Sequence, residues 1–396
     1  MSRPPLLTRD FALAASAVLM LHLAAFLFLH LPGFLQSLGA GEAEIGRIMS
    51  AQALGALLAW PFIGWAIDAY GRRAVTLAGA ALFIVAIGLY LAIGELGPFV
   101  YTVRLLDGVA STMWYAALFT HGADLVPAAR RTEGLAIFGA SALIPIGLGA
   151  QFGDAILAWA GYRELFFGAL GFALLGLVLC LPMRDVPTAR AVPSMPPARG
   201  LLIAATEPAL RPVWCAAFAF FVCAGALFTF LKTFVAVVEV GRAGGFFTAY
   251  ALTAVLFRVF LGWVPDRLGA RRMLGPAVLC YALGFVVLAG ADTPATVLAA
   301  GAVCGIGHGY TYPVLFSLVV SRAATQRRGA ATAFFAAIDW IGLLLAGPLF
   351  GQLIEVFGYG AAFSIAAAVL AAGTAQFYTA DRGFGGGRGA HERKVI

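Results

Sequence analysis

Charged residues are scarce in this chain of 396 residues: aspartate, glutamate, lysine and arginine make up 11% of it, and hydrophobic residues make up 62%. Soluble domains average about 25% charged and about 45–50% apolar residues. A soluble protein with so few charges could not cover its apolar surface. The composition therefore excludes a soluble enzyme, a nucleic-acid-binding domain and a disordered chain, and it predicts an all-α polytopic membrane protein.

The patterns of a metal site, a disulfide framework or a catalytic centre are missing as well. The five cysteines lie in or beside apolar runs, without a CxxC pair or a Cys/His ligand spacing, so the sequence predicts free thiols, no metal site and no cofactor. The Walker, HExxH and GxSxG motifs do not occur, which argues against ATP hydrolysis and against enzymatic catalysis. The net charge of +7 comes from basic residues placed between apolar runs, and this placement is typical of membrane topology signals.

Long apolar runs are what the chain has in abundance. A transmembrane helix needs about 20 mainly apolar residues, and runs of this length occur in two sets of six. The runs are 11–32, 45–67, 74–94, 98–120, 134–156 and 164–182, and then 212–236, 246–265, 273–291, 296–320, 330–354 and 360–379. The first run is too long for the apolar core of a signal peptide, so we expect a retained helix and twelve transmembrane helices in all.

The two sets of runs are separated by a long polar connection that is rich in arginine and proline. Such a segment is typical of a linker between domains. We therefore predict an N-terminal six-helix bundle (1–182), a cytoplasmic linker (183–211), a C-terminal six-helix bundle (212–379) and a cytoplasmic tail (380–396).

Basic residues are distributed unevenly between alternate connections. Twenty of them lie in the terminal segments and in alternate loops, whereas the loops of the other side carry three, which are Arg47, Arg163 and Arg242. Cytoplasmic loops carry the excess of basic residues in membrane proteins. We therefore expect both termini in the cytoplasm and the protein in a plasma membrane, as in the inner membrane of a bacterium.

A short motif occurs in equivalent loops of the two halves. The loop after the second run contains a glycine, an aspartate and another glycine that recur 198 residues later, after the eighth run. The two triplets are Gly64, Asp68, Gly71 and Gly262, Asp266, Gly269. Together with Arg104 and Gly108 in the fourth run, these motifs resemble the signatures of the major facilitator superfamily. The resemblance covers both halves and implies two pseudo-symmetric bundles of parallel topology and a functional monomer.

The resemblance also implies which residues control the conformation. It implies that Asp68 faces the start of the eleventh helix across the interface between the bundles, and that Asp266 faces the start of the fifth helix near Arg131. A carboxylate stabilises a helix N-terminus, so such contacts would close the cytoplasmic side and break when it opens. The gating candidates are Gly64, Asp68, Gly71, Arg72, Arg73, Arg131, Arg258, Asp266, Gly269, Arg271 and Arg328.

Charges inside the apolar runs point to a transport pathway, because a charge at the bilayer centre is costly. The resemblance implies that helices 1, 4, 7 and 10 line the cavity. The candidates for contact with the solute are His22, Arg104, Lys232, His308 and Tyr312. For Arg258 we expect a carboxylate or carbonyl partner rather than the solute, and Pro313 should leave one backbone carbonyl of the tenth helix unpaired.

Three side chains are candidates for proton coupling: Asp339, Asp107 and His308. Asp339 lies about ten residues into the eleventh helix without a basic residue within one turn, and removal from water favours the neutral form of a carboxyl group. Asp107 lies on the same helical face as Arg104, which favours its ionised form. We therefore prefer Asp339 to Asp107.

The sequence as a whole predicts a secondary active transporter that works by alternating access. Proton-coupled export of a small organic solute is preferred, because Gly347 to Gly351 resembles an element of efflux-type members. Import of an anionic or zwitterionic metabolite and uncoupled facilitated transport remain alternatives, and a non-transporting membrane sensor or enzyme is a distant third. The expected partners are the solute, protons and the lipid bilayer, without nucleic acid.

Overall fold

The computed structural model describes residues 6–127, 130–185 and 197–381, apart from a few side chains that include those of Arg131 and Asp266. Most of the predicted tail and part of the predicted linker lie outside these residues. Within them the regular structure is helical, and ten helical segments are long and apolar enough to cross a membrane.

The helices follow one another in two similar series. The first series is α1 (Arg9–Leu27), η1 (Phe28–His30), α2 (Leu31–Ser37), α3 (Glu42–Tyr70), α4 (Arg72–Tyr90), α5 (Pro98–Leu125), α6 (Arg131–Trp159) and α7 (Tyr162–Cys180). A short helix, α8 (Pro197–Thr206), lies in the linker. The second series is α9 (Arg211–Val237), α10 (Ala243–Leu261), α11 (Val264–Leu268), α12 (Ala270–Ala289), α13 (Pro294–Arg322), η3 (Thr325–Arg327) and α14 (Arg328–Ala380).

Two differences separate the ten apolar segments from the twelve predicted spans. The 53 residues of α14 hold both the eleventh and the twelfth span. The two spans are separated by a kink at Gly358, whose backbone angles are non-helical (φ 78°, ψ 170°). Helix α5 is not among the ten, since Arg104, Asp107 and Asp124 make it more polar. The prediction of twelve transmembrane helices in two six-helix bundles is thereby confirmed.

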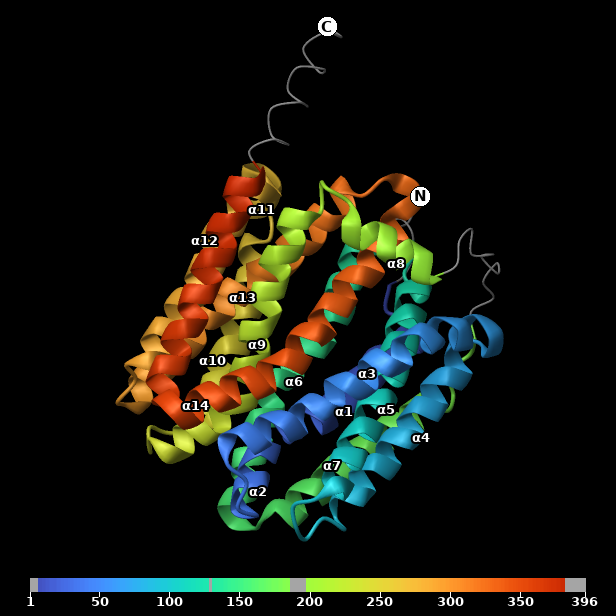
Figure 1. Ribbon diagram of the computed structural model, residues 1–396. Helices are drawn as coiled ribbons and strands as arrows, with labels where there is room; N and C mark the ends of the chain where they lie inside the picture. Colours follow the sequence, from blue (N-terminus) through green and yellow to red (C-terminus); the bar gives the residue numbers. More distant parts are fainter. Residues whose placement is uncertain (1–5, 128–129, 186–196, 382–396) are drawn as a thin grey trace, which may run out of the picture.

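The N-terminus of α1 and the C-terminus of α14 lie at the same end of the molecule, together with α8 and α11 (Figure 1). We call this end the termini end. The opposite end, which holds α2, is called the far end (Figure 1). The connections at the termini end are those that carry the excess of arginine.

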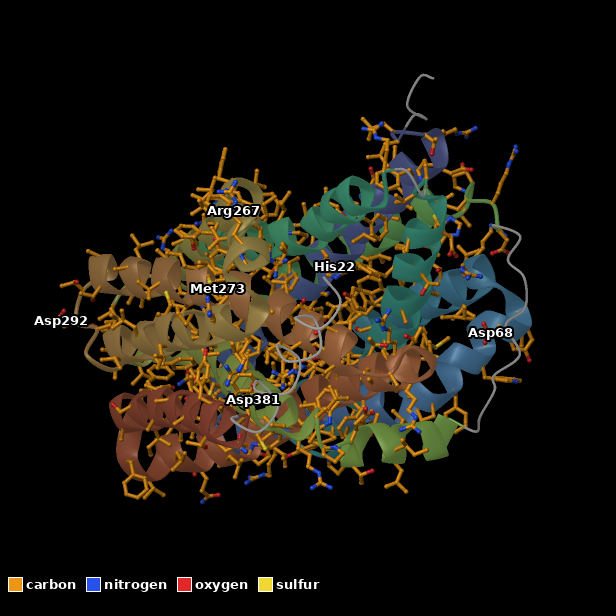
Figure 2. The ribbon with its side chains drawn as sticks, turned by 90° about the horizontal axis from the view of Figure 1, so that it is seen from above. His22, Asp68, Arg267, Met273, Asp292 and Asp381 are labelled. Atoms are coloured by element: carbon orange, nitrogen blue, oxygen red, sulfur yellow. The ribbon has the colours of Figure 1, made fainter. Side chains whose placement is uncertain are left out.

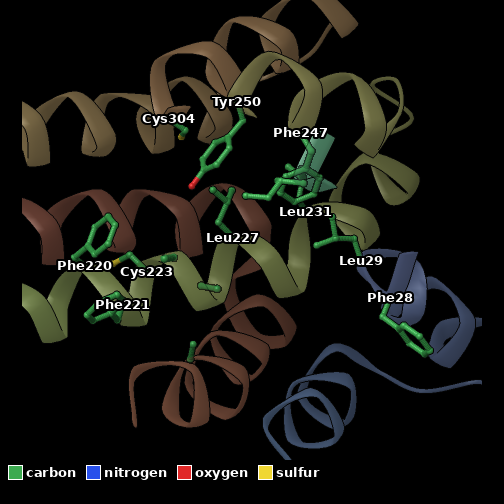
Figure 3. Packing of buried hydrophobic residues seen from close by; sticks show 14 of the residues in the cluster. Phe28, Leu29, Phe220, Phe221, Cys223, Leu227, Leu231, Phe247, Tyr250 and Cys304 are labelled. Atoms are coloured by element: carbon green, nitrogen blue, oxygen red, sulfur yellow. The ribbon is translucent and has the colours of Figure 1, made fainter. Parts of the chain in front are cut away.

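The two bundles meet where glycines let backbones approach. A side chain added at Gly46 of α3 would lie 2.1 Å from the carbonyl oxygen of Gly347 in α14, and one added at Gly147 of α6 would lie 3.1 Å from Thr248 of α10. Small residues allow such close helix packing in membranes. Each bundle also has its own core; Figure 3 shows Tyr250 of α10 reaching toward Leu227 of α9 and Cys304 of α13.

Two tight turns connect the signature loops to the helices that follow. Gly71 between α3 and α4 has φ 87°, and Gly269 between α11 and α12 has φ 85°. These angles are accessible to glycine and strained for residues with a side chain. The same conformation in two positions 198 residues apart agrees with the repeat seen in the sequence.

Substitution of Gly269 by alanine should destabilise the protein by about 1–3 kcal/mol, the cost of this backbone region for a residue with a side chain. Gly290, at the other end of α12, has φ −107°, and neither glycine has an atom within 4 Å of an added side chain. Gly290→Ala is therefore a matched control that should leave the melting temperature unchanged in a thermal unfolding measurement. Equal melting temperatures of the two variants would contradict this assignment.

Candidate functional site

An acidic side chain without a partner lies where the bundles face each other. Asp339 of α14 is partly buried and has no hydrogen bond or ion pair with the described residues. Its carboxyl group interacts electrostatically with the phenol groups of Tyr115 in α5 and Tyr312 in α13. These tyrosines are 39% and 38% exposed. The site therefore combines one carboxyl group with the phenol groups of two partly exposed tyrosines, one from each bundle.

His22 of α1 extends this site on the side of the first bundle. Its ring lies 4.9 Å from Trp114 and 5.4 Å from Tyr115, measured between ring centres, with edge-to-face geometry. The Nδ1 atom donates a hydrogen bond to the carbonyl oxygen of Val18 at 2.9 Å. In a neutral ring Nε2 is then the acceptor, so His22 offers an acceptor next to Tyr115.

Tyr115 was not among the residues predicted from the sequence. Asp107, Ser111 and Tyr115 are spaced by four residues and share one face of α5, which is a signal that the sequence contains. Ser111 does donate a hydrogen bond to the Asp107 carboxylate at 2.9 Å.

Arg104 and Asp107 lie inside the first bundle rather than in this site. Both are 1% exposed, and Arg104 Nη1 donates to the Asp107 carboxylate at 2.8 Å. Arg104 also donates to Gln52 at 2.6 Å, and Tyr90 donates to Asp107 at 3.1 Å. This network pairs the two charges and links α3, α4 and α5, while Arg104 Nε makes no hydrogen bond with the described residues. Its geometry favours a structural role.

His308 of α13 lies in the core of the second bundle. Its ring centre is 5.0 Å from Phe220, 5.5 Å from Tyr250 and 6.0 Å from Tyr281. Its Nδ1 atom is buried and makes no hydrogen bond with the described residues. The structure therefore does not bring His308 into contact with Asp339.

Arg258 of α10 binds a backbone carbonyl, as the sequence suggested. Its Nε atom donates to the carbonyl oxygen of Gly309 at 3.0 Å. Gly309 precedes Pro313 by four residues, so this is the carbonyl that the proline leaves without a helical partner.

Lys232 takes part in a contact between the bundles at the far end. Its ammonium group lies 3.5 Å from Asp154 Oδ1, and His30 Nδ1 lies 3.7 Å from the same oxygen. The other carboxylate oxygen, Oδ2, accepts a hydrogen bond from the backbone of Gly244 at 2.6 Å. Asp154 of α6, which is 7% exposed, thus caps the N-terminus of α10 in the other bundle. We call this contact the Asp154 lock.

A second contact of the same kind lies on the other side of the interface. Glu355 of α14 accepts a hydrogen bond at 3.0 Å from the backbone of Ala43, in the first turn of α3. Glu42 beside it accepts hydrogen bonds from Tyr359 at 2.6 Å and Thr233 at 3.1 Å. We call the contact between Glu355 and Ala43 the Glu355 lock. Asp154 and Glu355 are 201 residues apart, and so are Ala43 and Gly244, so the two locks are related by the repeat.

At the termini end the signature residues contact their own bundles. Arg72 forms an ion pair with Asp124, and the backbone of Arg73 donates to Asp185 at 2.9 Å. Asp68 is exposed and makes no hydrogen bond or ion pair with the described residues. Figure 2 shows it at the opposite side of the molecule from Arg267.

Of the remaining gating candidates, some have side chains that the structure describes and others do not. Arg328 and Gly64 are exposed, whereas the side chains of Arg131 and Asp266 lie outside the described part. The predicted contact of Asp68 with the start of the eleventh helix is not formed in this conformation. The bundles are therefore joined by capped helices at the far end, while Asp68 at the termini end is free.

Metal-binding geometry is not found in the described part of the chain, where no group of three His, Cys, Asp or Glu side chains converges.

Known proteins resemble this chain in sequence and in fold. The sequence model of the Major Facilitator Superfamily matches residues 11–247 and 238–393. An uncharacterized MFS-type transporter of Pseudomonas aeruginosa is 26% identical over 358 residues, which are 85% of this chain and 84% of that protein. The multidrug resistance protein MdtL of Escherichia coli is 29% identical over 169 residues, which are 42% of this chain and 43% of that protein.

The solved structures add the fold. A crystal structure of a variant of the nucleoside transporter NupG matches with a TM-score of 0.80 at 13% identity, and the match covers 94% of this chain and 100% of that one.

A charge cluster in the second bundle gives a prediction about acid stability. Asp381 is 1% exposed and accepts hydrogen bonds from Arg271 at 2.6 Å and Arg322 at 2.7 Å. Burial alone would raise the pKa of Asp381, but the two guanidinium groups outweigh it and hold the pKa below its ordinary value.

The stabilisation by Asp381 should be present above the ordinary aspartate pKa of about 3.9 and should be lost as the pH falls through the lower pKa of the folded state. Thermal unfolding in detergent, from neutral pH into this acidic range, measures the loss. Asp381→Asn should flatten the acid limb of the curve, whereas Asp68→Asn, at an exposed carboxylate, should reproduce the wild-type curve. An unchanged acid limb in Asp381→Asn would refute the assignment.

Proposed function

Because this chain belongs to the Major Facilitator Superfamily, we propose that it is a secondary active transporter that exports a small organic solute in exchange for protons by alternating access. The observation that carries this proposal is the partner-free carboxyl group of Asp339 between the two bundles. The site is completed by hydroxyl groups of both bundles, from Tyr115 and Tyr312. Rocking of the bundles would therefore change the surroundings of Asp339.

The conformation supports alternating access. The Asp154 and Glu355 locks join the bundles at the far end, whereas Asp68 at the termini end is exposed. The excess of arginine at the termini end supports a cytoplasmic location of that end. The structure then corresponds to an inward-open state, and the locks form the gate that faces the outside.

The free-energy cost of burying a charge would couple the binding of protons to the transport of the solute. An ionised carboxylate near the bilayer centre costs at least about 2.5–3.5 kcal/mol. The transporter can therefore adopt a closed intermediate without this free-energy cost only when Asp339 carries a proton or faces a cationic group of the solute. Proton uptake from outside would allow the empty carrier to return, and release into the cytoplasm would prepare Asp339 for the next solute.

Export in a plasma membrane is the preferred direction. The similarity to the multidrug resistance protein MdtL over 42% of the chain supports it, as does the resemblance of Gly347 to Gly351 to an efflux-type element. A functional monomer in the lipid bilayer completes the proposal.

Asp339→Asn should uncouple transport from protons. In proteoliposomes with an imposed pH gradient, proton flux driven by a solute found in a thermal-stabilisation screen should fall at least about tenfold, since each 1.4 kcal/mol changes an equilibrium tenfold. Exchange of labelled for unlabelled solute should persist, because asparagine keeps the shape of the site.

The matched control is Asp292→Asn, at an exposed carboxylate outside the spans, which should transport like the wild type. Proton-driven flux that survives in Asp339→Asn would reject Asp339 as the proton site. Flux in the wild type that ignores the pH gradient would reject proton coupling altogether and favour an uncoupled facilitator.

Removal of the lock carboxylates should favour opening of the far end. A carboxylate at a helix N-terminus contributes about 0.3–1 kcal/mol when exposed and up to about 2 kcal/mol when partly buried. Asp154 is buried and Glu355 is exposed, so Asp154→Asn should shift the conformational equilibrium more than Glu355→Gln. Spin labels at Trp159 of α6 and Val237 of α9, both exposed, should report a larger population with a long separation.

Glu164→Gln, at an exposed carboxylate in the first turn of α7, is the control and should leave the distance distribution unchanged. The same distribution in the double variant Asp154→Asn/Glu355→Gln as in the wild type would show that the locks do not hold the far end closed.

A further inference from the structure

One basic side chain inside the spans lacks an acidic partner. Of the three predicted from the sequence, Arg104 is neutralised by Asp107 at 2.8 Å and Lys232 by Asp154 at 3.5 Å. Arg258 has no ion pair with the described residues. Its electrostatic neighbours are the phenol groups of Tyr250 and Tyr312 and the ring of His308. A partly buried guanidinium group without a counter-charge is costly, so this position favours an anion from outside the protein.

The guanidinium group of Arg258 is fixed in orientation. Its Nε atom is held by the carbonyl oxygen of Gly309 at 3.0 Å, which Pro313 leaves available. Because the side chain is anchored through Nε, its two Nη groups remain as donors. Such a preorganised fork suits the paired oxygens of a carboxylate or a phosphate.

A pocket of about 430 Å³ opens beside Arg258, between α10, α13 and the turn from α11 to α12. This volume lies within the range of about 300–1,000 Å³ for small-molecule sites. Its wall includes Gly262, Pro265, Gly269, Pro313 and the hydroxyl-bearing Ser317, and none of the described residues that line it is acidic. The described wall of the pocket therefore offers space and positive charge.

Arg258 also belongs to the surroundings of the site between the bundles. Tyr312 of α13, which does not itself line the pocket, interacts electrostatically with Arg258 and also with Asp339 and Tyr115. This proximity of Arg258 to the proton site favours a solute over a lipid as the occupant of the pocket.

We propose that the pocket beside Arg258 binds the anionic group, a carboxylate or a phosphate, of the solute that the transporter carries. This inference rests on the proposed transport function and adds a substrate class to it. The Nη groups of Arg258 bind the anion.

Binding is tested on the purified full-length protein without any gradient, so that its failure is distinct from a failure of proton coupling. The probes are benzoate and phenyl phosphate, with benzyl alcohol as the neutral match, and the readout is ligand-dependent melting temperature. The anions should stabilise the wild type and benzyl alcohol should not. Arg258→Gln, whose amide can still donate to Gly309, should weaken anion binding at least about tenfold, the effect of losing one charge-assisted interaction.

Arg258→Lys keeps the charge and should retain part of the affinity, and the control Arg267→Gln, at an exposed arginine, should bind like the wild type. The proposal is overturned if neither anion stabilises the wild type, if Arg258→Gln binds both as tightly as the wild type, or if benzyl alcohol binds equally well. Loss of anion binding in nanodiscs of phosphatidylglycerol, but not of phosphatidylcholine, would identify the pocket as a lipid site and equally overturn it.

Discussion

The cost of placing charge in hydrocarbon governs the arrangement of this protein. An ionised side chain at the bilayer centre costs at least about 2.5–3.5 kcal/mol, and the charged groups inside the spans are arranged accordingly. Arg104 and Asp107 neutralise each other inside the first bundle, and Lys232 and Asp154 do so across the interface. Asp339 and Arg258 are candidates from the sequence that lack a counter-charge among the described residues. The incomplete positions are therefore those where a proton or a solute can complete the structure.

The internal repeat explains why the glycine turns and the locks occur in pairs, and positions that differ between the two halves are candidates for functional residues. The glycine turns at Gly71 and Gly269 have the same conformation, and both locks place a carboxylate on a helix N-terminus. The separation of 201 residues between the locks also relates Asp107 to His308. Asp107 belongs to a satisfied network, whereas His308 has an unpaired ring nitrogen. The second bundle also carries Asp339 and Arg258.

Features set by local chemistry could be predicted from the sequence, and features set by packing between distant segments could not. The spans follow from hydropathy, and the partner of Arg258 follows from the proline four residues after Gly309. Lys232 was expected near the solute, but its partner Asp154 is supplied by a helix of the other bundle, and no local pattern encodes that meeting. Tyr115 gains its place from the approach of α5 to α13 and α14. The exposure of Asp68 belongs to one conformation, and in the proposed cycle the same sequence would also adopt another.

The modest strength of the locks is what makes a reversible cycle possible. A carboxylate at a helix N-terminus contributes between about 0.3 and 2 kcal/mol, and the contact that the family resemblance implies for Asp68 at the termini end is of the same chemical kind. The free energy lost when the contacts at one end break would therefore be about equal to the free energy gained when the contacts at the other end form. One unit of pH difference corresponds to about 1.4 kcal/mol for a single proton, which is comparable with one lock. In the proposed cycle, a proton on Asp339 and an anion on Arg258 would therefore be enough to decide which end is open, whereas a much stronger lock would stop the cycle.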